Sequence, residues 1–133
     1  MNLLDVRNAL VQAVIDNATV QIAYENSGFD PVGLDAFIST HFMPATSEAM
    51  GKLQDSNDDE RGVFQISVFV KSNADDYDNQ QWAIILGFKS IFFNSAVIGD
   101  VDILEVTTNG GYAVESWYKR DISVNYMSFT DRS

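Results

Sequence analysis

The sequence predicts an α+β fold in which two helices pack on one face of a mainly antiparallel sheet. The apolar residues change from a helical period of about 3.6 to a strand period of two near Asn17, and return to the helical period near Asp78. The sequence Asn109-Gly110-Gly111 lies between two strand-like segments and is typical of hairpins, which pair strands antiparallel. The chain of 133 residues is expected to form a single domain over residues 1–133.

The first helix is predicted over residues 3–15. Asn2 is suited to the N-cap position, and Asp5 lies in the first turn, where the helix dipole favours a negative charge. One face of this helix is apolar and is formed by Leu3, Val6, Leu10, Ala13 and Val14.

Three strands are predicted between the helices. Residues 20–24 alternate between apolar and polar side chains, as do residues 64–70. A strand over residues 36–43 should end at Pro44, because proline has no backbone N–H for the ladder. Residues 45–62 are then expected to form a solvated polar loop.

The second helix is predicted over residues 78–95, with Asp78 and Gln81 spaced as in a capping box. It carries two apolar stripes, although a helix on a sheet needs only one. Ile84, Phe88, Ile91 and Phe92 form the first stripe, and Trp82, Leu86 and Phe93 form the second. Either the first helix or another subunit must cover the second stripe, which is therefore a candidate subunit interface.

The last third of the chain is predicted to form strands over residues 101–108 and 112–129, joined as a hairpin at residues 109–111.

The charge balance excludes several classes of function. The chain has 8 basic and 19 acidic residues, a net charge of −11, which disfavours binding to DNA, RNA or anionic membranes. No apolar run is long enough for a membrane span, and the first residues lack the pattern of a signal peptide. With no cysteine, disulfides, thiol nucleophiles and thiolate metal sites are excluded.

Four acidic residues, Asp55, Asp58, Asp59 and Glu60, lie within six positions of the expected loop. The segment starts like a calcium-binding EF-hand loop. It fails at the sixth position, where Glu60 replaces glycine, and at the twelfth, where Ile66 replaces glutamate. We expect these carboxylates to be exposed and to lack partners.

No catalytic, cofactor-binding or metal-binding residues are predicted. His41 is the only histidine, and the glycines form no nucleotide-binding loop. The acids Asp75, Asp76 and Asp78 precede the second helix, where they are expected to stabilise its N-terminus. The chain is therefore expected not to be an enzyme.

A series of short motifs resembles phage tail terminator (tail completion) proteins of the lambda type. The series begins with Ile22-Ala-Tyr24-Glu25-Asn26, Phe29-Asp-Pro31, Phe37-Ile38 and His41-Phe-Met-Pro44-Ala45. It continues with Gly62-Val63-Phe64-Gln65-Ile66-Ser67-Val68, the helix from Trp82 to Phe93, and Trp117-Tyr118 before the strand from Ile122 to Phe129. Together these motifs follow the family order along nearly the whole chain.

The resemblance implies a structural virion protein, without enzymatic activity or cofactor, that assembles in the host cytoplasm. Such proteins form a homo-hexameric ring on the head-proximal end of the tail tube, end tube polymerisation and join the tail to the head connector or stopper. DNA passes through the ring without specific binding, and the acidic residues 55–60 would then face the lumen or the tube-proximal rim. Alternatives are a head–tail connector or stopper protein, or a small-ligand-binding α+β domain.

Overall fold

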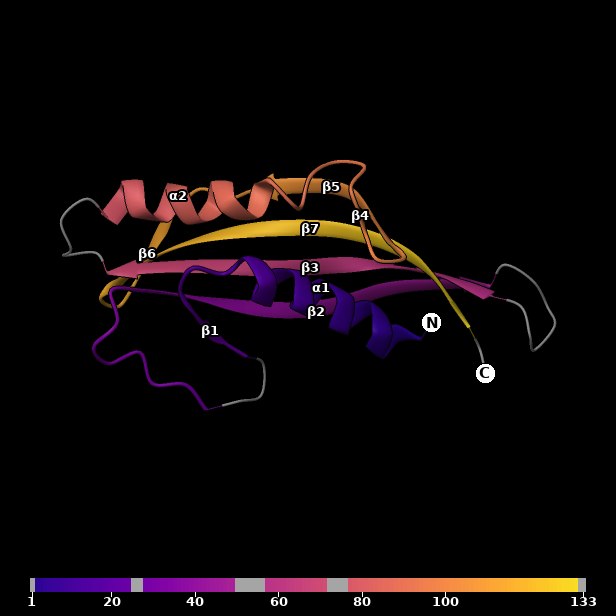
Figure 1. Ribbon diagram of the computed structural model, residues 1–133, viewed down its shortest axis with the longest axis horizontal. Coiled ribbons are helices and arrows are strands. Elements are labelled where there is room, and N and C mark those ends of the chain that lie inside the picture. The colour runs from indigo at the N-terminus through magenta and orange to yellow at the C-terminus, as the bar shows by residue number, and fades with distance from the viewer. Residues whose placement is uncertain (1, 25–27, 50–56, 72–76, 132–133) are drawn as a thin grey trace.

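The computed structural model describes residues 2–24, 28–49, 57–71 and 77–131, and Figure 1 shows two helices lying along a sheet of long strands. The described elements are α1 (Leu3–Asn17), β1 (Gln21–Ala23), β2 (Ala36–Ala49), β3 (Asn57–Lys71), α2 (Tyr77–Lys89), β4 (Val97–Ile98), β5 (Val101–Thr108), β6 (Tyr112–Val114) and β7 (Trp117–Asp131).

The strands form one sheet in the order β1-β2-β3-β7-β5-β4, and β6 pairs with β7. All pairs are antiparallel except β1 with β2, which run parallel, so the sheet is mixed and curls like half of a barrel. The prediction of a mainly antiparallel sheet with two helices is therefore correct in outline. The parallel edge strand was not predicted, because the spacing of apolar residues carries no information on strand direction.

Helix α1 begins where the sequence predicts it. The Asn2 side chain accepts a hydrogen bond from the Asp5 N–H, and the Asp5 carboxylate accepts one from the Asn2 N–H, both at 2.9 Å. This reciprocal capping satisfies two N–H groups that have no partner within the helix. The helix continues to Asn17, whose side chain donates to the Ala13 carbonyl at 2.8 Å.

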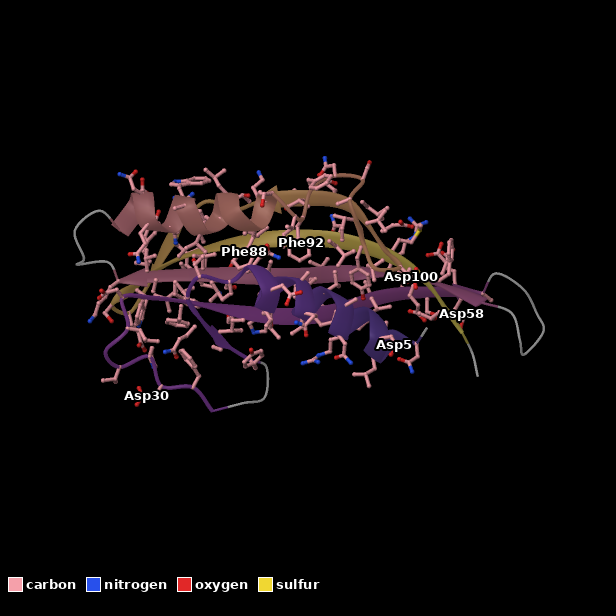
Figure 2. All side chains as sticks on the ribbon, in the orientation of Figure 1. Asp5, Asp30, Asp58, Phe88, Phe92 and Asp100 are labelled. Carbon is pink, nitrogen blue, oxygen red and sulfur yellow. The ribbon has the colours of Figure 1, made fainter. Side chains whose placement is uncertain are left out.

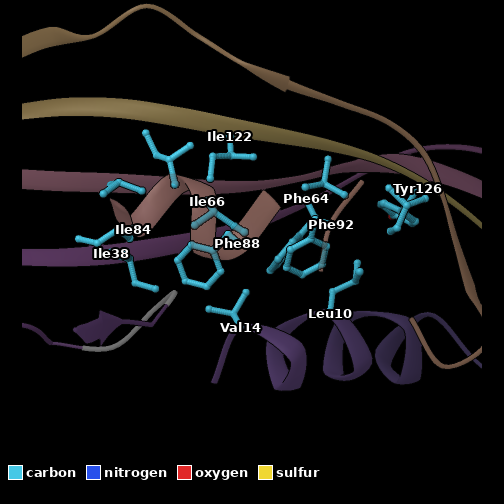
Figure 3. Close-up of a cluster of buried hydrophobic side chains, with 14 of the residues drawn as sticks. Leu10, Val14, Ile38, Phe64, Ile66, Ile84, Phe88, Phe92, Ile122 and Tyr126 are labelled. Atoms are coloured by element: carbon cyan, nitrogen blue, oxygen red, sulfur yellow. The ribbon is translucent and has the colours of Figure 1, made fainter. Parts of the chain in front are cut away.

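The core lies between the helices and one face of the sheet (Figure 3). Strand β3 supplies its centre, because the side chains of Phe64, Ile66, Val68 and Val70 all point to the same face and are fully buried. Both helices contribute to the same cluster, α1 through Val6, Leu10 and Val14 and α2 through Ile84, Ile85 and Phe88. Each large side chain removed from water in this way contributes about 1.5–3 kcal/mol before the entropy of ordering is subtracted.

Strand β2 does not end at Pro44, which corrects the sequence prediction. The Lys71 N–H donates to the Asp35 carbonyl at 2.9 Å, so these two residues form a hydrogen-bonded pair of the ladder. Hydrogen-bonded and non-hydrogen-bonded pairs alternate along antiparallel strands. The odd-numbered residues of β2 therefore direct their N–H and C=O groups toward β3, and the even-numbered residues direct theirs away. The backbone of Pro44 therefore faces the open side of β2, where its missing N–H costs no hydrogen bond. A register shift between Pro44 and Thr46 follows, and the strand continues to Ala49.

The predicted polar loop over residues 45–62 is also wrong over most of its described part. Residues 46–49 of β2 pair with residues 58–61 of β3, and residues 57–61 of β3 also pair with residues 127–131 of β7. These three segments are called the sheet extension below. The polar composition of these residues indicated a loop. Their pairing with β7 depends on residues far away in the sequence, so the local sequence could not reveal it.

Helix α2 begins at Tyr77 and ends at Lys89, so the predicted helix is too long at its C-terminus. The predicted capping box is wrong, because Gln81 is fully buried and binds the sheet. Its amide donates to the carbonyls of Val68 and Tyr118, at 3.0 and 3.1 Å, and its carbonyl accepts from Arg120 Nε at 3.2 Å. Gln81 therefore fastens α2 to β3 and β7.

The predicted antiparallel pairing of residues 101–108 with the segment 112–129 is correct, but the tight turn predicted at residues 109–111 is wrong. Strand β5 pairs with β7 rather than with the segment that directly follows it, and the tight turn lies between β6 and β7 at Glu115, which has a φ of 55°. Gly111 lies against the ring of Tyr118, where a Cβ atom would overlap the ring. The glycine is needed for this close approach and not for a two-residue turn.

Two glycines allow a matched test of packing. A Cβ atom on Gly62 would lie 2.5 Å from the Met43 backbone oxygen and 2.6 Å from the Tyr126 hydroxyl, whereas one on Gly87 would meet nothing within 4 Å. We expect Gly62→Ala to lower the free energy of unfolding by about 1–3 kcal/mol, because the backbone cannot yield. Gly87→Ala should raise it by about 0.5–1 kcal/mol, since alanine favours a helix. Urea unfolding of both variants measures these changes in the free energy of unfolding. Equal changes in the two variants would contradict the prediction.

Candidate functional site

The second stripe of α2 is exposed along most of its length. Leu86 is 61% exposed and Phe93 is 51% exposed, so α1 does not cover them. Trp82 differs, because it is partly buried and the Arg120 guanidinium lies 4.6 Å from the centre of its ring. We call Trp82, Leu86 and Phe93 the α2 stripe. Phe93 lies beyond the last residue of α2, so the prediction that all three belong to the helix is wrong for Phe93. Leu86 and Phe93 are largely exposed in the described chain.

The apolar surface continues from α2 onto strands β4 and β5, which the sequence analysis did not identify. Val97 is 64% exposed and Leu104 is 42% exposed. Backbone hydrogen bonds from Ala96 to Phe93 and from Ser95 to Ile103 hold this segment beside the end of the α2 stripe. A hollow of 290 Å³ lies here, lined by Ser95, Ala96, Asp102, Ile103, Leu104 and Met127. The alternation of buried and exposed side chains along β5 is interrupted by a register shift next to Leu104. The spacing of apolar residues in the sequence does not reveal such a shift.

Acidic residues gather at one end of the molecule, which Figure 2 marks with Asp5, Asp58 and Asp100. The sheet extension brings Glu48, Asp59 and Glu60 to this end, because Glu48 lies opposite Asp59 in the ladder. A hydrogen bond of 3.3 Å from Ser128 Oγ to the Asp100 carbonyl fixes the turn between β4 and β5 against β7. This group of Asp5, Glu48, Asp58, Asp59, Glu60 and Asp100 is called the acidic end below.

The expectation that these acids are exposed and lack partners is wrong for the three that the structure describes. Asp58, Asp59 and Glu60 are half-buried. Arg61 Nε and Nη2 each donate to one oxygen of Asp59 at 3.2 Å, and Asp59 in turn raises the pKa of Arg61. Glu60 accepts hydrogen bonds from Ser47 at 2.7 Å and from Thr130 at 3.3 Å. Asp58 is not without a partner either, and Asp55 lies outside the described residues.

The face of the sheet opposite the helices carries a polar network. Asp121 is only 6% exposed, and its carboxylate accepts hydrogen bonds from Ser67 at 2.7 Å and from Tyr112 at 3.4 Å. Lys119 lies 3.7 Å from the same carboxylate. Burial lowers the pKa of Lys119, but hydrogen bonding with Tyr112 and the charge of Asp121 outweigh it and leave this pKa raised. The network holds neighbouring strands in register and leaves Asp121 fully engaged.

No metal site is formed in the part of the chain that the structure describes, where histidine and carboxylate side chains nowhere gather in a group of three or more suited to an ion. His41 is exposed on β2, away from any such group. Among the described helices, neither has the length and apolar character needed to cross a membrane.

Large apolar side chains left open on a helix beside a curled sheet are typical of a subunit of a larger assembly. The chain matches the family model of phage tail terminator proteins over residues 5–126, and it therefore belongs to the phage tail terminator family. One similar solved structure has a TM-score of 0.64 at 20% sequence identity, over 92% of each chain, and supports the fold alone. No curated protein sequence matches the chain.

Family membership gives the chain a structural role in the phage tail, as a component of the virion. The family is a structural one and is not known for enzymatic activity. The resemblance found in the sequence motifs is thereby confirmed.

Tyr126 provides a test of the buried end of the core. Burial and, to a smaller degree, the charge of Glu60 raise the pKa of Tyr126 to about 12, from the usual 10.0. Between these pH values the folded state keeps a proton that the unfolded state loses, so stability should fall as pH rises from about 10 to 12. Its hydroxyl has no hydrogen-bond partner in the described chain, so Tyr126→Phe should be at least as stable at pH 7.

The measurement is urea unfolding at pH 8, 10 and 11.5. Tyr126→Phe should remove up to about 1.4 kcal/mol per pH unit of the decline above pH 10. Tyr24→Phe, at a side chain that is 44% exposed, serves as the control and should leave the decline unchanged. If stability falls above pH 10 to the same extent in both variants, the decline cannot be assigned to Tyr126.

Proposed function

We propose that this protein forms a ring, a homo-hexamer, that caps the head-proximal end of the phage tail tube. The ring ends polymerisation of the tube and joins the tail to the head connector or stopper protein. The observation that carries the proposal is the exposure of Leu86 on α2 and of Phe93 beyond its end, in a chain that belongs to the tail terminator family. Burying these side chains between subunits would supply the hydrophobic driving force for the ring.

The charge of the chain supports the proposed path of DNA. With a net charge of −11, the ring would let DNA pass without specific binding. We place the acidic end at the lumen or at the tube-proximal rim, where its carboxylates stay hydrated. Placed inside a subunit interface, carboxylates that lose their water without gaining a new partner would cost several kcal/mol each. The tube protein and the head connector are the proposed partners, and assembly takes place in the host cytoplasm.

Leu86→Asp tests the proposed interface. Because Leu86 is exposed, the variant should keep the circular dichroism spectrum and melting behaviour of a folded subunit. In the ring the new carboxylate would be buried without a partner, so native mass spectrometry and negative-stain images should show loss of the ring. Val32→Asp, at a side chain that is 83% exposed in the loop before β2, is the matched control and should leave the ring intact. An intact ring in Leu86→Asp would contradict the proposal.

Charge reversal tests the place of the acidic end. Glu48→Lys with Asp58→Lys spares Asp59, whose ion pair with Arg61 would otherwise be lost. At the lumen or rim, the new lysines should bind passing DNA and slow its ejection from complete particles, most strongly at low salt. Asp30→Lys with Asp35→Lys, two exposed acids outside the acidic end, is the control. Unchanged ejection at low salt, with tails of normal length, would place the acidic end on the outside.

A further inference from the structure

A ring needs two different contact surfaces on every subunit. If the α2 stripe packed only on the α2 stripe of a second copy, the contact would be symmetric and would stop at a dimer. We propose that the second surface is the outer face of α1, which packs on the α2 stripe of the next copy in the ring. This inference rests on the proposed function, because it names the other half of the ring contact.

The outer face of α1 carries its own apolar stripe. Leu4, Val11 and Ile15 are spaced seven and four residues apart, so they lie along one side of the helix. Leu4 is 59% exposed and Ile15 is 40% exposed, and Val11 is partly buried between them. We call these three residues the α1 stripe. The α1 stripe borders the face that packs on the sheet, where Val6, Leu10 and Val14 are fully buried and against which Val11 also packs.

The surface of α2 is suited to receive another helix. From Asn79 to Phe93 its sequence contains a single charged residue, Lys89, and depletion of charge is characteristic of interface centres. Three exposed neighbours of Leu86 are small, Ala83, Gly87 and Ser90, and the fourth is Lys89. A Cβ atom on Gly87 would meet nothing within 4 Å, so the backbone of α2 is open to close approach there.

The charges allow the direction of packing to be tested. Asp16 is exposed in the last turn of α1, where it accepts a hydrogen bond of 2.8 Å from Gln12. Lys89 is exposed at the last residue of α2. If α1 of one copy runs parallel to α2 of the next, Asp16 approaches Lys89 and the α1 stripe lies along the α2 stripe. The antiparallel arrangement would instead bring Asp5, which is exposed in the first turn of α1, to Lys89.

Other surfaces carry less support as the second contact. On the sheet face opposite the helices, the Ser67–Asp121 network already satisfies its own polar groups. The open edge of β2 is interrupted by Pro44, which cannot donate to an added strand.

Because the chain has no cysteine, single-cysteine variants can report the contact directly. A short thiol crosslinker added to a mixture of Ile15→Cys and Leu86→Cys should give heterodimers, while either variant alone should give few crosslinked dimers. A mixture of Val32→Cys and Leu86→Cys is the matched control and should give none above background. Efficient crosslinking of Leu86→Cys with itself would show a symmetric contact and overturn the inference.

Mixing two interface variants gives an independent test. Leu4→Asp places an acid in the first turn of α1, where the helix dipole tolerates it, so the subunit should stay folded. Leu4→Asp and Leu86→Asp should each lose the ring alone, with at least about a tenfold rise in the concentration needed for assembly. An equal mixture should form dimers, through the intact α1 of one variant and the intact α2 of the other, but no rings.

Charge exchange tests the direction of packing. Asp16→Lys and Lys89→Asp should each weaken the ring, and the double variant should restore it. If the wild type forms no ring in the same assays, the proposed function itself fails. If the wild type forms a ring that Leu4→Asp leaves intact, only the assignment of α1 is overturned.

Discussion

The pairing of β3 with a long strand on each side is the constraint on which the other elements depend. All fifteen residues of β3 pair with β7, and all but its first and last residues pair with β2, so β3 sets the register of the three longest strands. Its alternation directs Phe64, Ile66 and Val68 to one face, and that face is where both helices find apolar surface to cover. The opposite face is left without a helix from the described chain. It is held by polar contacts such as the one between Ser67 and Asp121, and by the stacked rings of Phe37 and Phe69.

The parts of the fold that could be predicted from the sequence are those governed by local periodicity and capping. The N-cap at Asn2 and the alternation of β3 are properties of neighbouring residues, and both were predicted correctly. The carboxylate of Asp5, predicted only as a favourable charge in the first turn, completes the cap. The errors occur where a residue far away in the sequence determines the local structure. The backbone of Pro44 faces an open edge, Gln81 binds carbonyls of two strands, and β7 draws Asp58 and its neighbours into the sheet. None of these partners is visible in the residues that surround each position.

The α2 stripe illustrates the same limit at the candidate site. The spacing of Trp82, Leu86 and Phe93 shows that they share a face, but it cannot show which of them finds cover within the chain. The structure separates them, since Arg120 lies over Trp82 while Leu86 stays open. Likewise, the break in alternation that exposes Leu104 belongs to a register shift of β5 against β7, which requires both strands to be known.

The sheet extension gives the molecule two parts that are held together by different interactions. Around Ile66 and Ile122 the strands are covered by apolar packing under both helices, whereas beyond Tyr126 the buried positions on the helix-facing side are Ser128 and Thr130. Their hydroxyl groups donate hydrogen bonds to the Asp100 carbonyl and to Glu60. The acidic residues are therefore carried by a part of the sheet in which hydroxyl groups, rather than hydrocarbon, fill the buried positions.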